Sequence, residues 1–139
     1  MMGAWEWDGR WWNTVASNAP SLGETRVVWD SFRNRAVFFG GRAGLSYSNG
    51  TWEFDGTTWT QMSPTSSPPA RHFHSMAFDS DRHVTVLFGG SDPSNNRLSD
   101  TWEYDGTTWT QRFPAFSPPG NATDGAAMEY DPATQRTTY

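Results

Sequence analysis

The stretch Thr51–Gln61 decides the fold. It reads TWEFDGTTWTQ, and Thr101–Gln111 reads TWEYDGTTWTQ, so eleven positions recur at an offset of 50 residues with one Phe-to-Tyr difference. A shorter copy, formed by Trp5–Gly9 and Trp12, lies near the start of the chain. Agreement of this length at a fixed period is typical of repeat proteins, in which each repeat forms one supersecondary unit.

A second unit alternates with the first. Val27–Asp30 followed by Val37–Gly41 is similar to Met76–Asp79 followed by Val86–Gly90, and Met128–Asp131 begins a third copy. Each segment is short and rich in aromatic or β-branched residues, which favours β-strands. No helical period extends beyond a single turn, so the sequence predicts an all-β protein.

Turn residues separate the predicted strands. Asp55-Gly56 and Asp105-Gly106 are hairpin dipeptides, because glycine tolerates the positive φ of tight turns. Residues 57–60 are therefore predicted as the strand that returns from the first of these turns. The proline-rich segments 64–69 and 114–119 are predicted as loops, because proline donates no hydrogen bond to a sheet.

These motifs resemble the kelch repeat. The resemblance rests on an apolar strand that ends in Gly-Gly and on a later pair of aromatic residues, at Phe39–Gly41 and Phe88–Gly90, at Trp52 and Trp59, and at Trp102 and Trp109. A period near 50 residues also fits that family. The resemblance implies a β-propeller, in which every repeat is a four-stranded blade beside a central channel.

Counting strands on this pattern predicts one kelch-like propeller domain over residues 1–139, with an incomplete ring. Complete blades are expected at 24–62 and 72–112. The outer half of a blade is expected at 1–23, and the inner half of another at 122–139.

Three blades are fewer than the four to eight that typically close a propeller. An open arc would expose aromatic faces, which drive association. We therefore expect self-assembly, in which the inner half of one chain pairs with the outer half of the next. A homodimer with six blades is favoured, and a trimer with nine is the alternative. The chain would also fit as a fragment of a longer gene product.

Composition excludes several classes of function. The formal net charge is −5, all ten basic residues are arginine, and there is no cysteine or lysine. An acidic chain without a basic stripe is a poor nucleic-acid binder. Disulfides, cysteine-ligated metals and lysine Schiff bases are also excluded. No signal peptide or transmembrane segment is recognisable, so the sequence assigns no compartment and no membrane partner.

The long connections are expected on one face of the blades, because successive strands alternate in direction. Binding residues are most often found on such loops. The candidate ligand contacts there are Arg42, Tyr47, Arg71, His72, Asn95, Arg97 and Asp124.

Other residues admit a functional and a structural interpretation. His72 and His74 would share one side of a strand, as a metal pair does, but a hydrogen-bonded structural His74 is favoured. A structural role is also favoured for Arg71, which would bond loop carbonyls. Asp79-Ser80-Asp81 is interpreted as a turn in place of a calcium half-site. Glu53 and Glu103 recur once per repeat, which favours structure over a catalytic pair.

The sequence therefore favours a non-catalytic binding or interaction module, for a glycan or a protein, without a metal or another cofactor. Kelch-type propellers include a copper galactose oxidase and sialic-acid mutarotases. The first needs a Cys cross-linked to Tyr, which this chain lacks. A mutarotase-like enzyme with a site at the channel mouth is the alternative, and a purely structural propeller fragment is the third.

Overall fold

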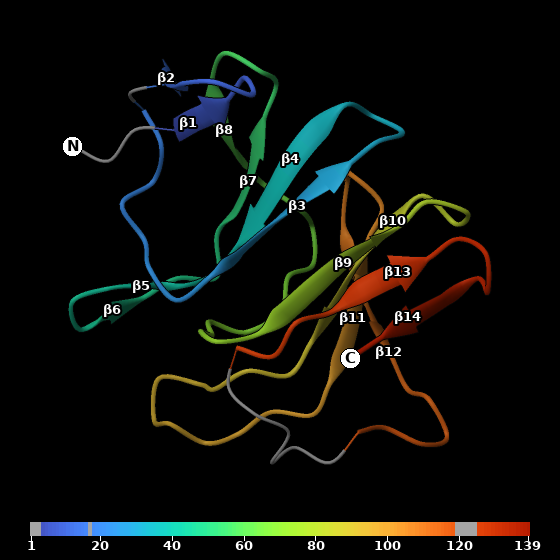
Figure 1. Cartoon of the computed structure of the whole chain (residues 1–139). Coiled ribbons are helices and arrows are strands. Elements are labelled where there is room, and N and C mark those ends of the chain that lie inside the picture. Colours follow the sequence, from blue (N-terminus) through green and yellow to red (C-terminus); the bar gives the residue numbers. More distant parts are fainter. Residues whose placement is uncertain (1–3, 17, 119–124) are drawn as a thin grey trace.

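The computed structural model describes residues 4–16, 18–118 and 125–139. Every regular element in these residues is a β-strand, which confirms the all-β prediction. Four-stranded antiparallel sheets and two-stranded hairpins make up the fold, and no sheet among the described residues closes on itself (Figure 1).

Two four-stranded sheets have the same topology, with strands that follow one another in sequence order. The first contains β3 (Arg26–Asp30), β4 (Arg35–Phe39), β7 (Thr51–Phe54) and β8 (Trp59–Met62). The second contains β9 (Ser75–Asp79), β10 (Val84–Phe88), β11 (Thr101–Tyr104) and β12 (Trp109–Arg112).

Three hairpins complete the description: β1 (Ala4–Trp7) with β2 (Trp12–Ala16), β5 (Arg42–Ala43) with β6 (Ser46–Tyr47), and β13 (Glu129–Asp131) with β14 (Arg136–Thr138). The β5–β6 hairpin lies in a connection that the sequence predicts only as a loop. β3, β9 and β13 lie side by side in that order (Figure 1).

One predicted strand begins later than expected. The sequence predicts residues 57–60, but β8 begins at Trp59. The side chain of Asp55 accepts hydrogen bonds from the backbone N–H groups of Thr57 and Thr58, at 2.9 and 2.8 Å. These bonds hold both threonines in the turn, which is how aspartate competes with strand pairing.

The turn after the first strand of each sheet is built in the same way. Asp30, Asp79 and Asp131 each accept backbone N–H bonds from the residues that follow. A residue with φ between 53° and 55° follows in every turn, at Asn34, His83 and Gln135. The Asp79–Asp81 segment is therefore a side-chain-stabilised turn, as the sequence indicates.

The main core lies between the two four-stranded sheets. Val37 and Phe39 of the first sheet pack against Leu87, Tyr104 and Trp109 of the second. A further cluster on the other face of the first sheet contains Phe38, Phe54 and Trp59. Alternation of side chains along each strand supplies both faces from a single sheet.

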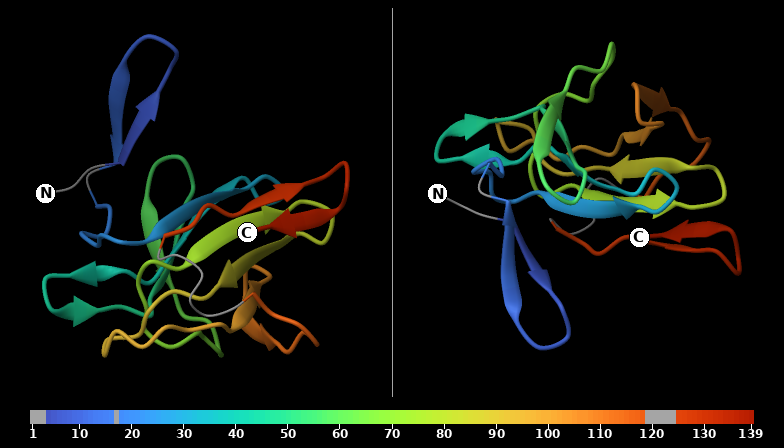
Figure 2. Two further views of the ribbon diagram at one scale, coloured as in Figure 1. Left: turned by 60° about the horizontal axis from the view of Figure 1, so that its bottom comes forward. Right: turned by 90° about the horizontal axis from the view of Figure 1, so that it is seen from above.

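The β1–β2 hairpin projects away from the two sheets (Figure 2). Its aromatic residues Trp5, Trp7, Trp11 and Trp12 are all exposed. The sequence predicts that neighbouring Trp11 and Trp12 point to opposite sides and that one is exposed. Trp11 and Trp12 are both exposed, although Val15 on β2 packs against the cluster of Phe38, Phe54 and Trp59 on the first sheet.

Gly90 lies where the loop after β10 closely approaches the segment that precedes β9. Gly56 and Gly90 have similar φ angles of 97° and 88°, but a Cβ on Gly90 would lie 2.6 Å from the carbonyl oxygen of His72, whereas nothing lies within 4 Å at Gly56. We expect Gly90→Ala to lower the free energy of unfolding by about 3 kcal/mol or more, and Gly56→Ala by about 1 kcal/mol. Chemical denaturation measures both. Equal losses would contradict the close approach.

Candidate functional site

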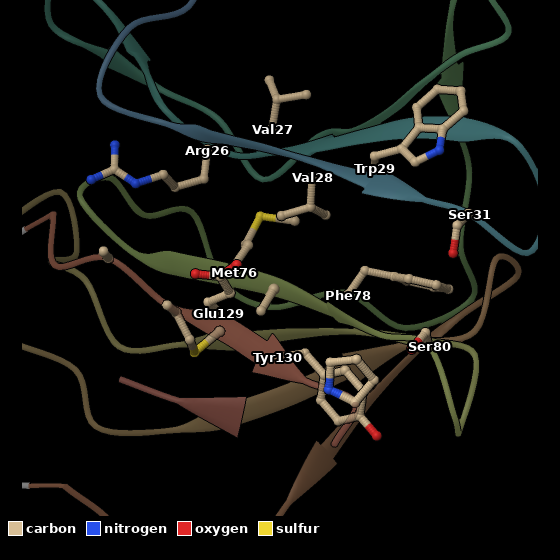
Figure 3. A pocket seen from close by; sticks show the side chains of 14 residues that line it. Arg26, Val27, Val28, Trp29, Ser31, Met76, Phe78, Ser80, Glu129 and Tyr130 are labelled. Carbon is tan, nitrogen blue, oxygen red and sulfur yellow. The ribbon is translucent and has the colours of Figure 1, made fainter. Parts of the chain in front are cut away.

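An open groove of about 610 Å³ lies along the first strands of the repeats (Figure 3). It is lined by β3, β9 and β13 and includes one aromatic residue from each strand, namely Trp29, Phe78 and Tyr130. These three residues gather toward one end of the groove, and Arg26 lies toward the other (Figure 3). They directly precede the repeated aspartates, so their clustering follows from the repeat.

A polar cluster lies near the start of the first sheet and is centred on Glu24. One Glu24 oxygen, Oε2, lies 2.6 Å from Arg42 Nε and 2.9 Å from His72 Nδ1. The Tyr47 ring lies 5.1 Å from the His72 ring. Three predicted site residues, Arg42, Tyr47 and His72, are therefore brought together.

Charge pairing sets the ionisation of this cluster. Desolvation opposes the ionisation of Glu24, but hydrogen bonds from Arg42 and His72 outweigh it and hold the pKa of Glu24 below its ordinary value. The same hydrogen bond to Glu24 raises the pKa of Arg42. At neutral pH the cluster therefore presents an ionised carboxylate and a guanidinium.

Arg71 does not belong to this cluster. Its guanidinium is fully buried and forms two bonds to the Asp100 carboxylate, of 2.6 and 2.8 Å. It also donates to the carbonyl oxygens of Gly89 and Pro69. These contacts support the structural interpretation of Arg71. Because its guanidinium is buried, the side chain is not presented to a ligand.

The remaining predicted contacts lie on the loop between β10 and β11 or beyond the described residues. Asn95 is exposed, with a φ of 62°, in a turn stabilised by the side chain of Asp92. Arg97 is exposed and pairs through its backbone with Ser91, which in turn pairs with His72. Asp124 lies outside the described residues.

His74 differs from its expected role. The ring is fully buried, and neither Nδ1 nor Nε2 has a hydrogen-bond partner among the described residues. It packs edge-on against Phe39, with ring centroids 5.7 Å apart. His72 and His74 also do not share a strand, because both precede Ser75 and Phe73 between them has a φ of 55°. In the part of the chain that the structure describes, no group of three acidic or histidine side chains is arranged to hold a metal ion.

The recurring glutamates form structural ion pairs. Glu53 lies 2.6 Å from Arg33 Nη1, and Glu103 lies 2.5 Å from Arg82 Nη1. Each arginine also binds the aspartate at the end of the first strand of its own sheet. This use in both sheets is what their periodicity predicts.

Sequence reasoning missed Glu24 and Asp100, the acidic partners of the predicted contacts. Neither belongs to a repeated motif, because Asp100 aligns with Gly50 and Glu24 aligns with Phe73. The groove aromatics were visible as a repeated aromatic-Asp pair, but only the side-by-side arrangement of the strands shows that they meet.

No protein-family model matches the sequence, and no curated protein matches it significantly. The described residues also contain no helix with the length and hydrophobicity needed to cross a membrane.

His74 predicts a pH dependence of stability. Burial, reinforced by the positive charges of Arg71 and Arg26, lowers the pKa of His74 to about 3. Below pH 6.5 His74 therefore binds a proton in the unfolded chain but not in the folded chain. The free energy of unfolding consequently falls as the pH falls. We expect a loss of about 2 kcal/mol between about pH 7.5 and pH 5.

His74→Leu is the matched variant, because it is apolar and has no proton to bind. Its free energy of unfolding should change much less over the same pH range. Denaturation at several pH values measures both proteins. Parallel pH profiles would show that His74 is not the group responsible.

Proposed function

We propose that this protein is a non-catalytic binding and interaction module built from kelch-type propeller blades that close by self-association. One observation carries the proposal: two complete sheets with the same strand order are accompanied by a hairpin before them and another after them. The first strands of the repeats, β3, β9 and β13, lie side by side, as the strands of the inner wall of a propeller would.

The exposed apolar surface supports self-association. Val27 and Trp29 on β3, and Trp5, Trp7 and Trp12 on the strands of the β1–β2 hairpin, are exposed aromatic or aliphatic side chains. Surface of this kind is characteristic of an interface. A two-fold dimer would supply six four-stranded sheets and would pair the open edges of the two hairpins, β1 and β14, with each other.

The ionisation of the polar clusters supports a binding role in preference to acid–base catalysis. A general acid needs a carboxyl pKa raised toward neutrality. The pKa values of Glu24 and Asp100 are lowered, because arginine hydrogen bonds outweigh the desolvation of each carboxylate. Both groups therefore serve as fixed charges that position arginine side chains.

Particle mass tests self-association. Light scattering at micromolar concentration should give about twice the 15.6 kDa mass of the chain. Val27→Asp places a charge on the exposed face of β3 and should shift the particle toward the monomer, whereas Thr57→Asp, in an exposed hairpin turn, should not. A monomeric mass for the unaltered protein would contradict the proposal.

The cluster around Glu24 is the proposed ligand contact, with a carbohydrate as the ligand, because an aromatic ring lies beside charged hydrogen-bonding groups there. An array of neutral and acidic oligosaccharides is the probe. Tyr47→Ser should reduce binding at least tenfold, and Thr57→Ser should leave it unchanged. Failure of the unaltered protein to bind any sugar on the array would overturn the carbohydrate assignment.

A further inference from the structure

The second four-stranded sheet packs an aromatic pair on the first sheet. In the described residues the β1–β2 hairpin makes no equivalent contact, and no equivalent pair packs on the second sheet. We propose that the β1–β2 hairpin of a second copy pairs with β14 and covers the face of β9–β12 that points away from the first sheet. This inference rests on the proposed self-association and specifies its strands, side chains and register.

The hairpin carries side chains that are buried elsewhere in the chain. Trp7 pairs with Trp12 in the way that Tyr104 pairs with Trp109, so the two pairs occupy equivalent places. Trp7 is 53% exposed and Trp12 is 64% exposed, whereas Tyr104 and Trp109 are each 1% exposed. The same pair of positions is therefore uncovered in the hairpin and covered in the second sheet.

The contact that buries Tyr104 and Trp109 is specific. The Tyr104 hydroxyl donates to Glu53 at 3.1 Å, and the Arg33 guanidinium lies 5.5 Å from the centre of the Tyr104 ring. Trp109 Nε1 donates to the Thr51 hydroxyl at 2.9 Å. An aromatic pair from one sheet thus covers the Arg–Glu pair of the sheet before it.

The second sheet holds an equivalent receptor. Arg82 binds Asp79 and Glu103 at distances close to those of Arg33 in the first sheet, and Glu103 also binds Arg112 at 2.7 Å, where the first sheet has Met62. The Arg82 side chain is 55% exposed, compared with 24% for Arg33, and no described aromatic ring lies over it. Trp7 of a second copy would supply that ring, in a cation–π contact like that of Tyr104.

An unpaired strand edge lies beside this receptor. In the complete sheets the second strand pairs on both sides, since β10 pairs with β9 and with β11. β14 is the equivalent second strand, and in the described chain it pairs only with β13. Such an edge presents backbone groups that accept another strand.

Repeat equivalence fixes the register of the new pair. Thr85 lies opposite Tyr104 and Val86 lies opposite Glu103. Carrying these pairs to the equivalent positions places Thr137 opposite Trp7, and Thr138 opposite Glu6, of the second copy. The hairpin is on the far side of the first sheet from β13–β14, so a second chain is its partner (Figures 1 and 2).

A disulfide tests the register, because the chain contains no cysteine of its own. Glu6→Cys combined with Thr138→Cys should form a disulfide-linked dimer under mild oxidation in more than half of the chains. The control combines Glu6→Cys with Thr137→Cys, whose side chain points to the opposite face of β14, and should cross-link less than a tenth. Non-reducing electrophoresis separates the products.

The outcomes separate this inference from the proposal on which it rests. A dimeric mass without a disulfide between positions 6 and 138, or equal cross-linking of both pairs, would overturn the register and leave self-association standing. A disulfide within one chain would overturn the second copy as partner. A monomeric mass would overturn both statements.

A second variant tests the aromatic contact without oxidation. Trp7→Ser should weaken dimerisation at least tenfold, because it removes the ring that covers Arg82. Trp11→Ser is the matched control, since Trp11 is an exposed tryptophan in the turn of the same hairpin. Equal effects of the two substitutions would overturn the contact with Arg82.

Discussion

The fold depends on a buried carboxylate that is neutralised from a turn. Glu53 is nearly buried on β7 and would be unstable there without a partner. Arg33 supplies the charge, and Asp30 holds Arg33 in place at 2.7 Å. Desolvation opposes the charge on Arg33, but its two acidic partners outweigh it and raise its pKa. Because Tyr104 then packs on this pair, one ionic group fixes the turn, the sheet and the neighbouring sheet together.

The glycine pairs set the second constraint, which is the distance between loops. Gly40 and Gly41 both have positive φ, and Gly41 donates its N–H to the carbonyl of Arg71 at 2.8 Å. The neighbouring sheets are also linked by backbone bonds from Phe73 to Glu24 and from Gly125 to Phe73. Polar backbone groups at the ends of the sheets are thereby satisfied without extra strands.

The periodic part of the fold could be predicted from the sequence, and the aperiodic part could not. Strand order followed from the repeats, because every strand outside the β5–β6 hairpin has a counterpart 47–52 residues away. The projection of the β1–β2 hairpin, the unpartnered ring of His74 and the salt bridge from Arg71 to Asp100 depend on contacts between segments that share no pattern. Sequence periodicity predicts the contacts that recur in every repeat. It does not predict contacts that occur only once in the chain.

This division also indicates where function lies in a repeat protein of this kind. Side chains that recur make the same structural contacts in each repeat, as Glu53, Glu103 and their arginines do. Residues that differ between repeats are not needed for the packing that the repeats share, so they can serve another role. The Glu24–Arg42–His72 cluster differs in this way, because the equivalent position in the second sheet is Phe73 and carries no charge. A ligand that distinguishes one face of the protein from another must therefore use the aperiodic residues, even though repeated aromatics line the groove along β3, β9 and β13.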